Sequence, residues 1–260
     1  MPLAAILPLL CLVGSGAAGA AGAAAGGAAQ VCPREPAEKG PSAADALVAA
    51  GVRLARRGRW DEAAARLERA VARDPCSAPA HHNLGIALGT AGRHREAVRE
   101  LREALLLEGD QPVTLEALGL TLLLAGRPTE AVDAYRQSVG LDPARAHAHY
   151  NLGVALERLG RSEEALRSFE RSLALNPQLG EAAAAIGALF IRAGRYNSAV
   201  LACRDAIRLR PDDGAAHYCL ALALLAVGNA DEALDPLLRA YRLRPDLVGA
   251  NGAFVEAAKP

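Results

Sequence analysis

Histidine is the side chain in this sequence best suited to metal binding or proton transfer, and three histidines recur at a fixed interval. His81, His149 and His217 are 68 residues apart, and each follows an alanine. Histidines on such distant segments are too far apart to share one metal ion, and the close pairs lack the i, i+4 spacing that places two ligands on one helical face. We therefore predict no metal site. Two interpretations of the row stay open: polar rings exposed along a groove, or rings packed between helices.

Cysteine could supply a redox-active pair. Cys203 and Cys219 lie eight residues on either side of Pro211. If two helices run antiparallel around that proline, the cysteines lie at equal height on neighbouring helices, although a bond also requires their Cβ atoms to approach within about 4.5 Å. We expect a disulfide between them in an oxidising compartment. Two buried, reduced thiols are the alternative.

The other residue types that perform covalent or acid–base chemistry form no recognisable catalytic set. The sequence has no Ser/His/Asp order and no glycine loop of the kind that binds phosphate. Carboxylates recur at one position of a repeated pattern, which is typical of residues on a helix surface or in a first helical turn. These are Glu62, Glu96, Glu130, Glu164 and Glu232. We predict that the chain is not an enzyme and uses no cofactor.

The elements that position these residues repeat every 34 residues. Six consecutive segments align without insertion or deletion: 44–77, 78–111, 112–145, 146–179, 180–213 and 214–247. Position 15 of each segment is glycine and position 20 is alanine. Position 8 is glycine except in the sixth segment, and position 32 is proline except in the second. A helix that ends at a glycine, restarts shortly afterwards and stops before a proline is a helix–turn–helix unit.

This spacing resembles the tetratricopeptide repeat. The residues that carry the resemblance in the fourth segment are residues 150–153, Gly160, Ala165, Phe169 and Pro177. The match covers 204 of the 260 residues. It implies an all-α fold, a right-handed superhelical solenoid of six helix–turn–helix repeats. Neither helix can bury its apolar stripe alone, so each repeat is stable only when it stacks on its neighbours.

Composition restricts the class of partner. The chain is 52% hydrophobic and 22% charged, with 29 basic and 29 acidic residues. Without a net charge it has no field that would attract nucleic acid. The family resemblance implies a protein or peptide partner, and we predict no small-molecule substrate.

The expected binding groove lies on the first helix of each repeat. Positions 5, 6, 9, 12 and 13 lie away from the stripe that packs on the second helix, so we expect their side chains to be free to meet a partner. The first helix of the third repeat is apolar nearly all round, more than one buried stripe requires. In repeats 2 to 4 the groove residues are His82, Asn83, Glu116, Leu120, Leu123, Tyr150, Asn151, Val154 and Arg158.

Asparagine at position 6 suggests how a peptide would be held. Asn83 and Asn151 occupy this position. Relatives that resemble O-GlcNAc transferase carry an asparagine ladder there, which holds a peptide backbone. Other residues break the ladder in four of the six repeats, so the two asparagines are either part of a binding pattern or family background.

The function predicted from these features is a non-enzymatic adaptor or scaffold that binds a peptide segment of a partner in its concave groove. Two alternatives stay open. One is an accessory module of a glycosyltransferase-type enzyme similar to O-GlcNAc transferase. The other is a pilotin-like factor for secretion or pilus assembly, which the chain resembles by architecture only.

The N-terminal region resembles a secretory signal peptide. Residues 1–29 contain an apolar run from Leu3 to Val13, too short to span a bilayer, and then an alanine- and glycine-rich tract. Ala18, Ala20 and Ala28 supply small residues for cleavage, although no basic residue precedes the run. We expect a secreted or periplasmic protein. A cytoplasmic location follows if the leader is not a signal peptide.

The segments on either side of the repeats are short. Residues 30–43 are rich in proline and charge, which is typical of a linker before the repeats at 44–247. Residues 248–260 restart the repeat with Phe254 at position 7, so we expect a short C-terminal capping helix. Because this cap is weakly polar, self-association through it is also expected.

Overall fold

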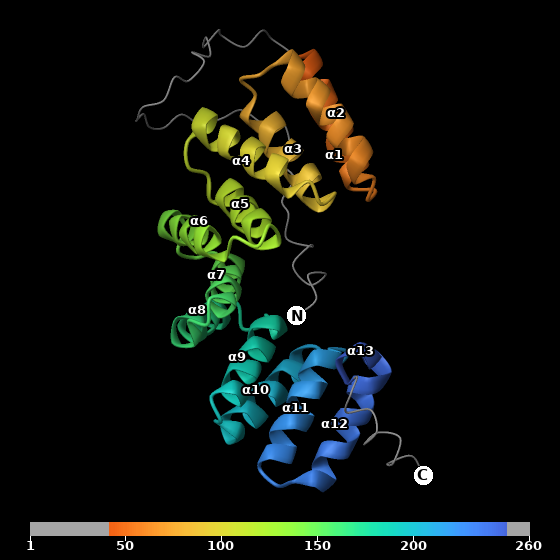
Figure 1. Cartoon of the computed structure of the whole chain (residues 1–260), viewed down its shortest axis with the longest axis vertical. Helices are drawn as coiled ribbons and strands as arrows, with labels where there is room; N and C mark the ends of the chain where they lie inside the picture. Colours follow the sequence, from red (N-terminus) through yellow and green to blue (C-terminus); the bar gives the residue numbers. More distant parts are fainter. Residues whose placement is uncertain (1–41, 249–260) are drawn as a thin grey trace. The chain divides into compact units, whose positions relative to one another are not determined.

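The computed structural model describes residues 42–248, which form thirteen helices and no strand (Figure 1). The all-α helical repeat fold expected from the sequence is confirmed. No helix in this part of the chain combines the length and apolar character needed to cross a bilayer. The leader, the linker up to Pro41 and the predicted cap at 249–260 lie outside the described residues.

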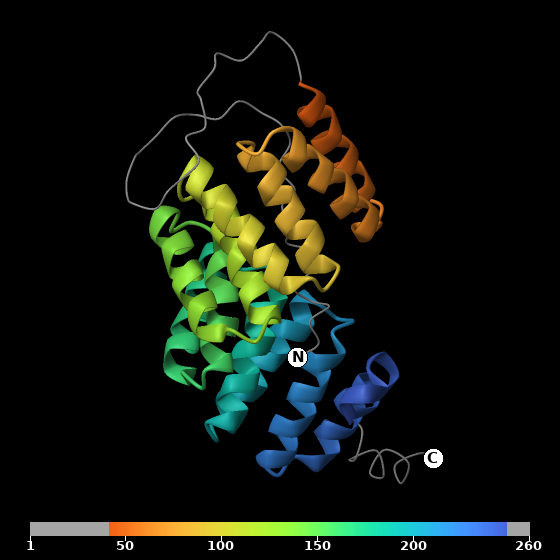
Figure 2. The ribbon, with the colours of Figure 1, turned by 45° about the horizontal axis from the view of Figure 1, so that its top comes forward.

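The chain divides into two compact units, and the first ends at Pro143. Its described part is a stack of three helical hairpins (Figures 1 and 2). They are α1 (Ala43–Ala55) with α2 (Trp60–Arg73), α3 (Ala78–Thr90) with α4 (His94–Glu108), and α5 (Pro112–Leu124) with α6 (Pro128–Leu141).

The second unit begins at Ala144, and its described part, up to Val248, contains three further hairpins and a short helix. They are α7 (Ala146–Arg158) with α8 (Ser162–Leu175), α9 (Gly180–Arg192) with α10 (Tyr196–Leu209), α11 (Gly214–Ala226) with α12 (Ala230–Leu243), and α13 (Pro245–Val248). In both units every second helix begins at position 17 of its repeat. The expected helix–turn–helix register is therefore present in all six repeats.

The invariant glycine at position 15 makes the turn of each hairpin. Its φ angle lies between +69° and +85° in all six repeats, a left-handed conformation that side chains other than glycine rarely adopt. This turn ends the first helix and lets the second fold back against it. The six glycines are Gly58, Gly92, Gly126, Gly160, Gly194 and Gly228.

The glycine at position 8 lets the two helices of a hairpin approach closely. A Cβ atom added at Gly153 would lie 2.5 Å from Cε1 of Phe169, the fully buried residue at position 24 of the facing helix. A Cβ atom added at Gly85 would lie at the same distance from Leu101, and one added at Gly51 or Gly119 would lie 2.6 or 2.8 Å from its own position-24 side chain. Glycine is needed here for space, since any side chain would have to displace a packed neighbour.

Successive repeats stack through a second set of positions. In the first unit, Val48 and Val52 of α1 share one core cluster with Leu84 of α3. Val48 and Val52 are positions 5 and 9 of their repeat, and Leu84 is position 7 of the next repeat. The first helix of each of these repeats therefore has one face on its own partner helix and another on the following repeat.

We predict that Gly153→Ala destabilises the protein by about 1–3 kcal/mol, because the added methyl group must displace the ring of Phe169 in a filled core. Urea unfolding followed by circular dichroism measures the change. The matched control is Gly140→Ala in α6, where a Cβ atom would have no neighbour within 4 Å. This control should raise stability by up to about 1 kcal/mol. Equal effects of the two substitutions would contradict the close-approach argument.

Candidate functional site

In the first unit, the structure buries most of the predicted groove residues. His82 is 2% exposed and Asn83 and Leu120 are also buried, while Glu116 and Leu123 keep partial exposure. The ring of His82 hydrogen-bonds through Nδ1 to the hydroxyl of Thr114 in the next repeat, at 2.9 Å. The Asn83 amide donates to the carbonyl of Pro79, one turn earlier in its own helix, at 2.8 Å.

In the second unit, α7 carries the four remaining groove residues. Tyr150, Asn151 and Val154 are buried, and Arg158 is exposed. The Tyr150 ring lies 5.6 Å from the ring of Phe169, centroid to centroid. Burial, together with the charges of nearby carboxylates, raises the pKa of Tyr150 to about 12, so its hydroxyl stays protonated at neutral pH.

The expectation that all nine side chains are free to meet a partner is therefore wrong for six of them. Stacking accounts for burial at positions 5 and 9: in the first unit Val48 and Val52 of α1 share a core cluster with Leu84 of the next first helix. His82 shows this directly, since its hydrogen bond crosses to position 3 of the next repeat. The structure leaves Glu116, Leu123 and Arg158 as the accessible members of the set. Whether the nine residues contribute to partner binding stays a prediction.

Position 13 supplies accessible side chains at the ends of the first helices in both units. Arg158 and Arg192 are exposed at this position in the second unit, and so is Arg56 in the first. The Arg192 guanidinium lies 2.8 Å from the Glu157 carboxylate of α7, and this ion pair joins α9 to α7. Helical periodicity predicts that position 13 faces away from the second helix. Its share of the accessible surface of the first helices becomes clear only once positions 5 and 9 are seen to be buried.

The recurring histidines at position 4 connect neighbouring repeats. His81 donates from Nε2 to the carbonyl oxygen of Pro75 at 3.0 Å, and His217 donates from Nε2 to that of Pro211 at 2.8 Å. Both rings are buried. These contacts favour the second interpretation of the row, rings packed between helices. Among the described residues no group of three or more His, Cys, Asp or Glu side chains could hold a metal ion.

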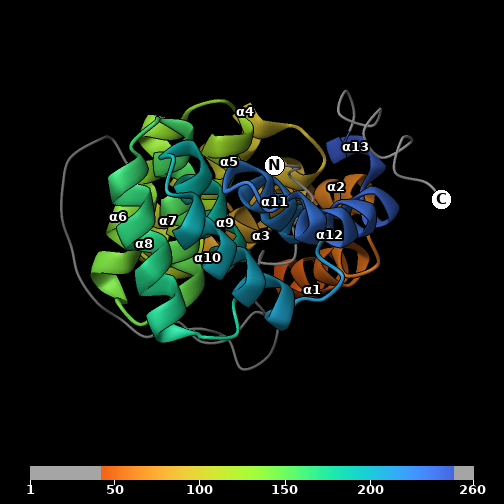
Figure 3. The same ribbon diagram turned by 90° about the horizontal axis from the view of Figure 1, so that it is seen from below.

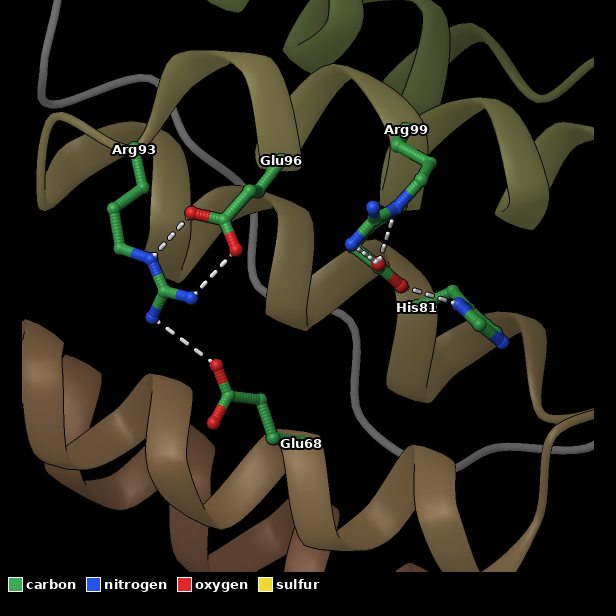
Figure 4. Close-up of polar contacts among 6 residues, drawn as sticks. Glu68, His81, Arg93, Glu96 and Arg99 are labelled. Atoms are coloured by element: carbon green, nitrogen blue, oxygen red, sulfur yellow. Dashed lines mark hydrogen bonds and ion pairs between the residues drawn. The ribbon is translucent and has the colours of Figure 1, made fainter.

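His81 also forms a buried ion pair. Its Nδ1 lies 2.8 Å from the carboxylate of Glu100 on α4, and the two side chains are only 8% and 12% exposed. Since the Pro75 carbonyl and the carboxylate can only accept, both ring nitrogens carry protons and the imidazole is charged in this geometry. Arg99 also contacts the Glu100 carboxylate, at 3.3 Å, and Figure 4 shows Arg99 and His81 side by side.

The pKa values of the pair shift apart. Burial lowers the pKa of His81, but the bond to Glu100, the bond to the Pro75 carbonyl and the charges of Glu100 and Glu103 together raise it above its usual 6.5. The hydrogen bond from His81 lowers the pKa of Glu100 below its usual 4.5, against the effect of burial. Both shifts favour the charged forms of the pair.

The recurring carboxylates at position 19 are engaged by arginines. In repeats 1 to 4 an arginine at position 16 donates two hydrogen bonds to the glutamate three residues later, at the start of the second helix. Arg93 reaches Glu96 in this way and also contacts Glu68 of the preceding repeat at 3.1 Å (Figure 4). These carboxylates hold helix ends and adjacent repeats together.

Cys203 and Cys219 are joined by a disulfide that links α10 to α11. Their Cα atoms are 6.0 Å apart, inside the usual range for such bonds. Gly187 of α9 lies against both sulfur atoms, since a Cβ atom there would be 2.6 Å from Sγ of Cys203 and 2.8 Å from Sγ of Cys219. The bond therefore sits at the close approach of α9 to α10.

The sequence matches the family description Tetratricopeptide repeat at residues 82–146, 116–180 and 184–248, and a second description of the same name at residues 44–87. Together these matches cover more than half of the chain. A search of curated protein sequences found no match.

Similar solved structures belong to proteins with the same kind of fold. MamA is 25% identical, covers 70% of this chain and 97% of its own, and has a TM-score of 0.58. The PilF protein of Pseudomonas aeruginosa is 24% identical, with coverage of 83% and 97% and a TM-score of 0.71. YrrB, described as a TPR protein with an unusual peptide-binding site, is 21% identical, with coverage of 72% and 97% and a TM-score of 0.58. The last two similarities concern the fold alone.

We predict that the His81–Glu100 pair makes stability depend on pH. The contribution of His81 is fully present below its unfolded pKa of about 6.5 and is lost as pH rises through its raised folded pKa. That of Glu100 is present above pH 4.5 and is lost as pH falls through its lowered folded pKa. His81→Gln should therefore cost about 1–3 kcal/mol at pH 6 and less at pH 9.

Urea unfolding between pH 6 and 9 measures this dependence, and His147→Gln on α7 is the matched control. If wild type and His81→Gln lose stability in parallel as pH rises, the ion pair does not contribute.

We also predict that the disulfide stabilises the second unit. In a chain-entropy estimate, a bond across a sequence separation of 16 residues contributes about 3 kcal/mol. The double variant Cys203→Ala with Cys219→Ala should lose about that much in urea unfolding. Mass spectrometry of non-reduced peptides should identify the linked pair, whereas quantitative alkylation of both thiols without reduction would contradict it.

Proposed function

The chain belongs to the tetratricopeptide repeat family, and on that premise we propose that it is a non-catalytic adaptor whose first helices hold an extended peptide segment of a partner protein. A role in protein interaction is general to the family. The proposal of a peptide site rests on the second unit, where α7 and α9 carry polar side chains next to the buried residues of the first helices.

Asn151 carries the proposal. Its side chain is 3% exposed, and its Oδ1 atom has no hydrogen-bond partner. A buried acceptor left without a partner costs about 1–3 kcal/mol, and native structures seldom leave one. A backbone N–H of a bound peptide would supply the missing donor. In relatives with the asparagine ladder, the asparagine at position 6 holds a peptide backbone.

Arg158 extends the same site along α7. It lies seven residues after Asn151, so the two share one side of the helix, with Val154 between them. Arg158 is exposed, and its guanidinium can donate to a carbonyl or carboxylate of the same peptide. Because Asn151 and Val154 are covered in the structure, a peptide must move neighbouring side chains to reach Asn151. We expect association to be slower than for a preformed groove.

The structural contacts of the potentially reactive side chains support the non-catalytic part of the proposal. The carboxylates at position 19 bind arginines, and His81 and His217 bind proline carbonyls of the preceding repeat. These groups connect helices and repeats.

An exported location is part of the same proposal. It rests on the apolar leader in the sequence, and the Cys203–Cys219 disulfide supports it, because such bonds persist mainly in oxidising compartments.

The proposal is tested by selecting random dodecapeptides on phage against the immobilised full-length chain. Enriched peptides are then titrated by fluorescence anisotropy. Asn151→Ala and Arg158→Ala should each weaken binding at least tenfold, which is about 1.4 kcal/mol. Arg167→Ala, an exposed arginine on α8, is the matched control and should bind as wild type does.

Circular dichroism verifies that all three variants stay helical. A library that yields no enriched peptide, or enriched peptides that bind all variants equally, would refute a peptide site on α7.

A further inference from the structure

The hairpin of α1 and α2, coloured orange in Figures 1 and 3, carries a set of exposed arginines. Arg53 lies in the last turn of α1 and Arg57 in the turn that follows, while Arg66 and Arg69 lie on α2. All four side chains are exposed, and none of them forms an ion pair with another described residue. We call the surface formed by these arginines with Ala46 and Ala50 the leading face.

The later repeats show what kind of neighbour this face accepts. Positions 3, 7 and 10 of the first helix are buried in repeats 2 to 6, and in repeat 2 they share a core cluster with the hairpin before them. Position 23 of the second helix lies at the same contact, since Glu100 bonds to His81, which also bonds to the Pro75 carbonyl of the preceding repeat. The corresponding residues of repeat 1 are all exposed or partly exposed: Ala46, Ala50, Arg53 and Arg66. The leading face therefore has the shape that packs against helices elsewhere in the chain.

The charge of the leading face is particular to repeat 1. Positions 10, 14 and 23 are basic in this repeat alone. The C-terminal end of α1 favours cations, which accounts in part for Arg53 and Arg57. Arg66 and Arg69 lie in the middle of α2, where the helix dipole has no such effect. A surface that served solubility alone would mix both signs of charge.

The carboxylates of the same hairpin are mostly engaged elsewhere. Of the five in residues 42–77, four have other partners. Asp45 accepts from the backbone N–H of Ser42 and Asp74 from that of Cys76, while Glu62 pairs with Arg59 and Glu68 with Arg93 of the next repeat. The hairpin thus leaves the arginines of the leading face available to an external anion.

Contacts between successive repeats show which anion fits. Within each unit, every described contact of this kind includes an arginine–glutamate ion pair, at 2.8–3.1 Å. The pairs are Arg93–Glu68 and Arg102–Glu130 in the first unit, and Arg192–Glu157 and Arg204–Glu232 in the second. A face with the shape of such a contact and with arginine alone is complementary to a helix that supplies the carboxylates.

We propose that the leading face binds an acidic helix of a partner protein, in the way that a preceding repeat would pack. The small side chains of Ala46 and Ala50 let that helix approach α1 closely. Glutamate or aspartate side chains on successive turns of the helix pair with the four arginines. This site lies on the first unit, whereas the peptide site proposed on α7 lies on the second, so either can exist without the other.

The surroundings of the leading face favour a protein helix over an anionic membrane. Surfaces that bind membranes combine basic residues with large apolar side chains that enter the lipid. Among the described residues, none of the exposed large hydrophobic side chains belongs to the first hairpin. Between its arginines the leading face offers only alanines.

Selection from a library of helices tests the proposal. Alanine-rich helices of about five turns, randomised along one side, are displayed on phage and selected on the immobilised full-length chain. Enriched peptides should carry aspartate or glutamate on successive turns. In fluorescence anisotropy, Arg53→Gln with Arg57→Gln should weaken their binding at least tenfold. The matched control is Arg167→Gln with Arg171→Gln, two exposed arginines four residues apart on α8, which should bind as wild type does.

Charge reversal separates a specific contact from general attraction. Peptides in which lysine replaces each acidic residue should bind Arg53→Glu with Arg57→Glu at least tenfold more tightly than they bind wild type. Circular dichroism verifies that the variants stay helical. A selection that enriches no peptide, or one whose peptides lack carboxylates, overturns the proposal, and so does equal binding to all variants.

Two further measurements identify other occupants. Sedimentation with vesicles of phosphatidylcholine and phosphatidylglycerol should show no binding that depends on Arg53 and Arg57; such binding would assign the face to a membrane and overturn the proposal. The linker of the chain itself contains Glu35 and Glu38. Glu35→Gln with Glu38→Gln should leave the affinity for the selected peptides unchanged, whereas a gain of tenfold or more would identify the linker as the occupant.

Discussion

The close approach of the two helices of each hairpin, glycine at position 8 against a larger side chain at position 24, is the contact on which the rest of the structure depends. The facing side chain is a leucine, a tyrosine or a phenylalanine in four of the five repeats that carry the glycine. In the sixth repeat Ala221 lies opposite Leu237, so the smallest side chain is tolerated there. Because this contact determines how the two helices of a hairpin pack, it also determines which faces of the first helix remain for the next repeat and for partners.

The disulfide belongs to the same constraint. In the fifth repeat position 24 is Cys203, which is smaller than the residue found there in any other repeat. The second sulfur atom, from Cys219 of the next repeat, also lies against Gly187, so two sulfur atoms together occupy the space that one larger side chain fills elsewhere. The packing within the fifth hairpin and the covalent link to the next repeat therefore involve the same two sulfur atoms. Loss of the disulfide would weaken the packing as well as the link.

Helix boundaries could be predicted from the sequence because local chemistry determines them. The left-handed turn at position 15 requires glycine, and the proline at position 32 follows the end of the second helix. The accessible surface could not be predicted in the same way. Whether His82 is free depends on Thr114 of the next repeat, and the periodicity of one helix carries no information about such a contact. In an isolated hairpin positions 5 and 9 are available to a partner, whereas stacking on the next repeat buries them in the first unit.

Stacking also determines where partner specificity can reside. Positions 8, 15, 20 and 24 are restricted by the hairpin, and positions 5 and 9 by the following repeat, so a change at any of them disturbs packing. Position 13 escapes both restrictions, and its chemistry varies freely within this one chain, from arginine to threonine, leucine and alanine. Arg158 and Arg192 are exposed there on successive first helices of the second unit. Since position 13 lies outside the buried core, a repeat protein of this kind can alter what it recognises with little change to the packing of its helices.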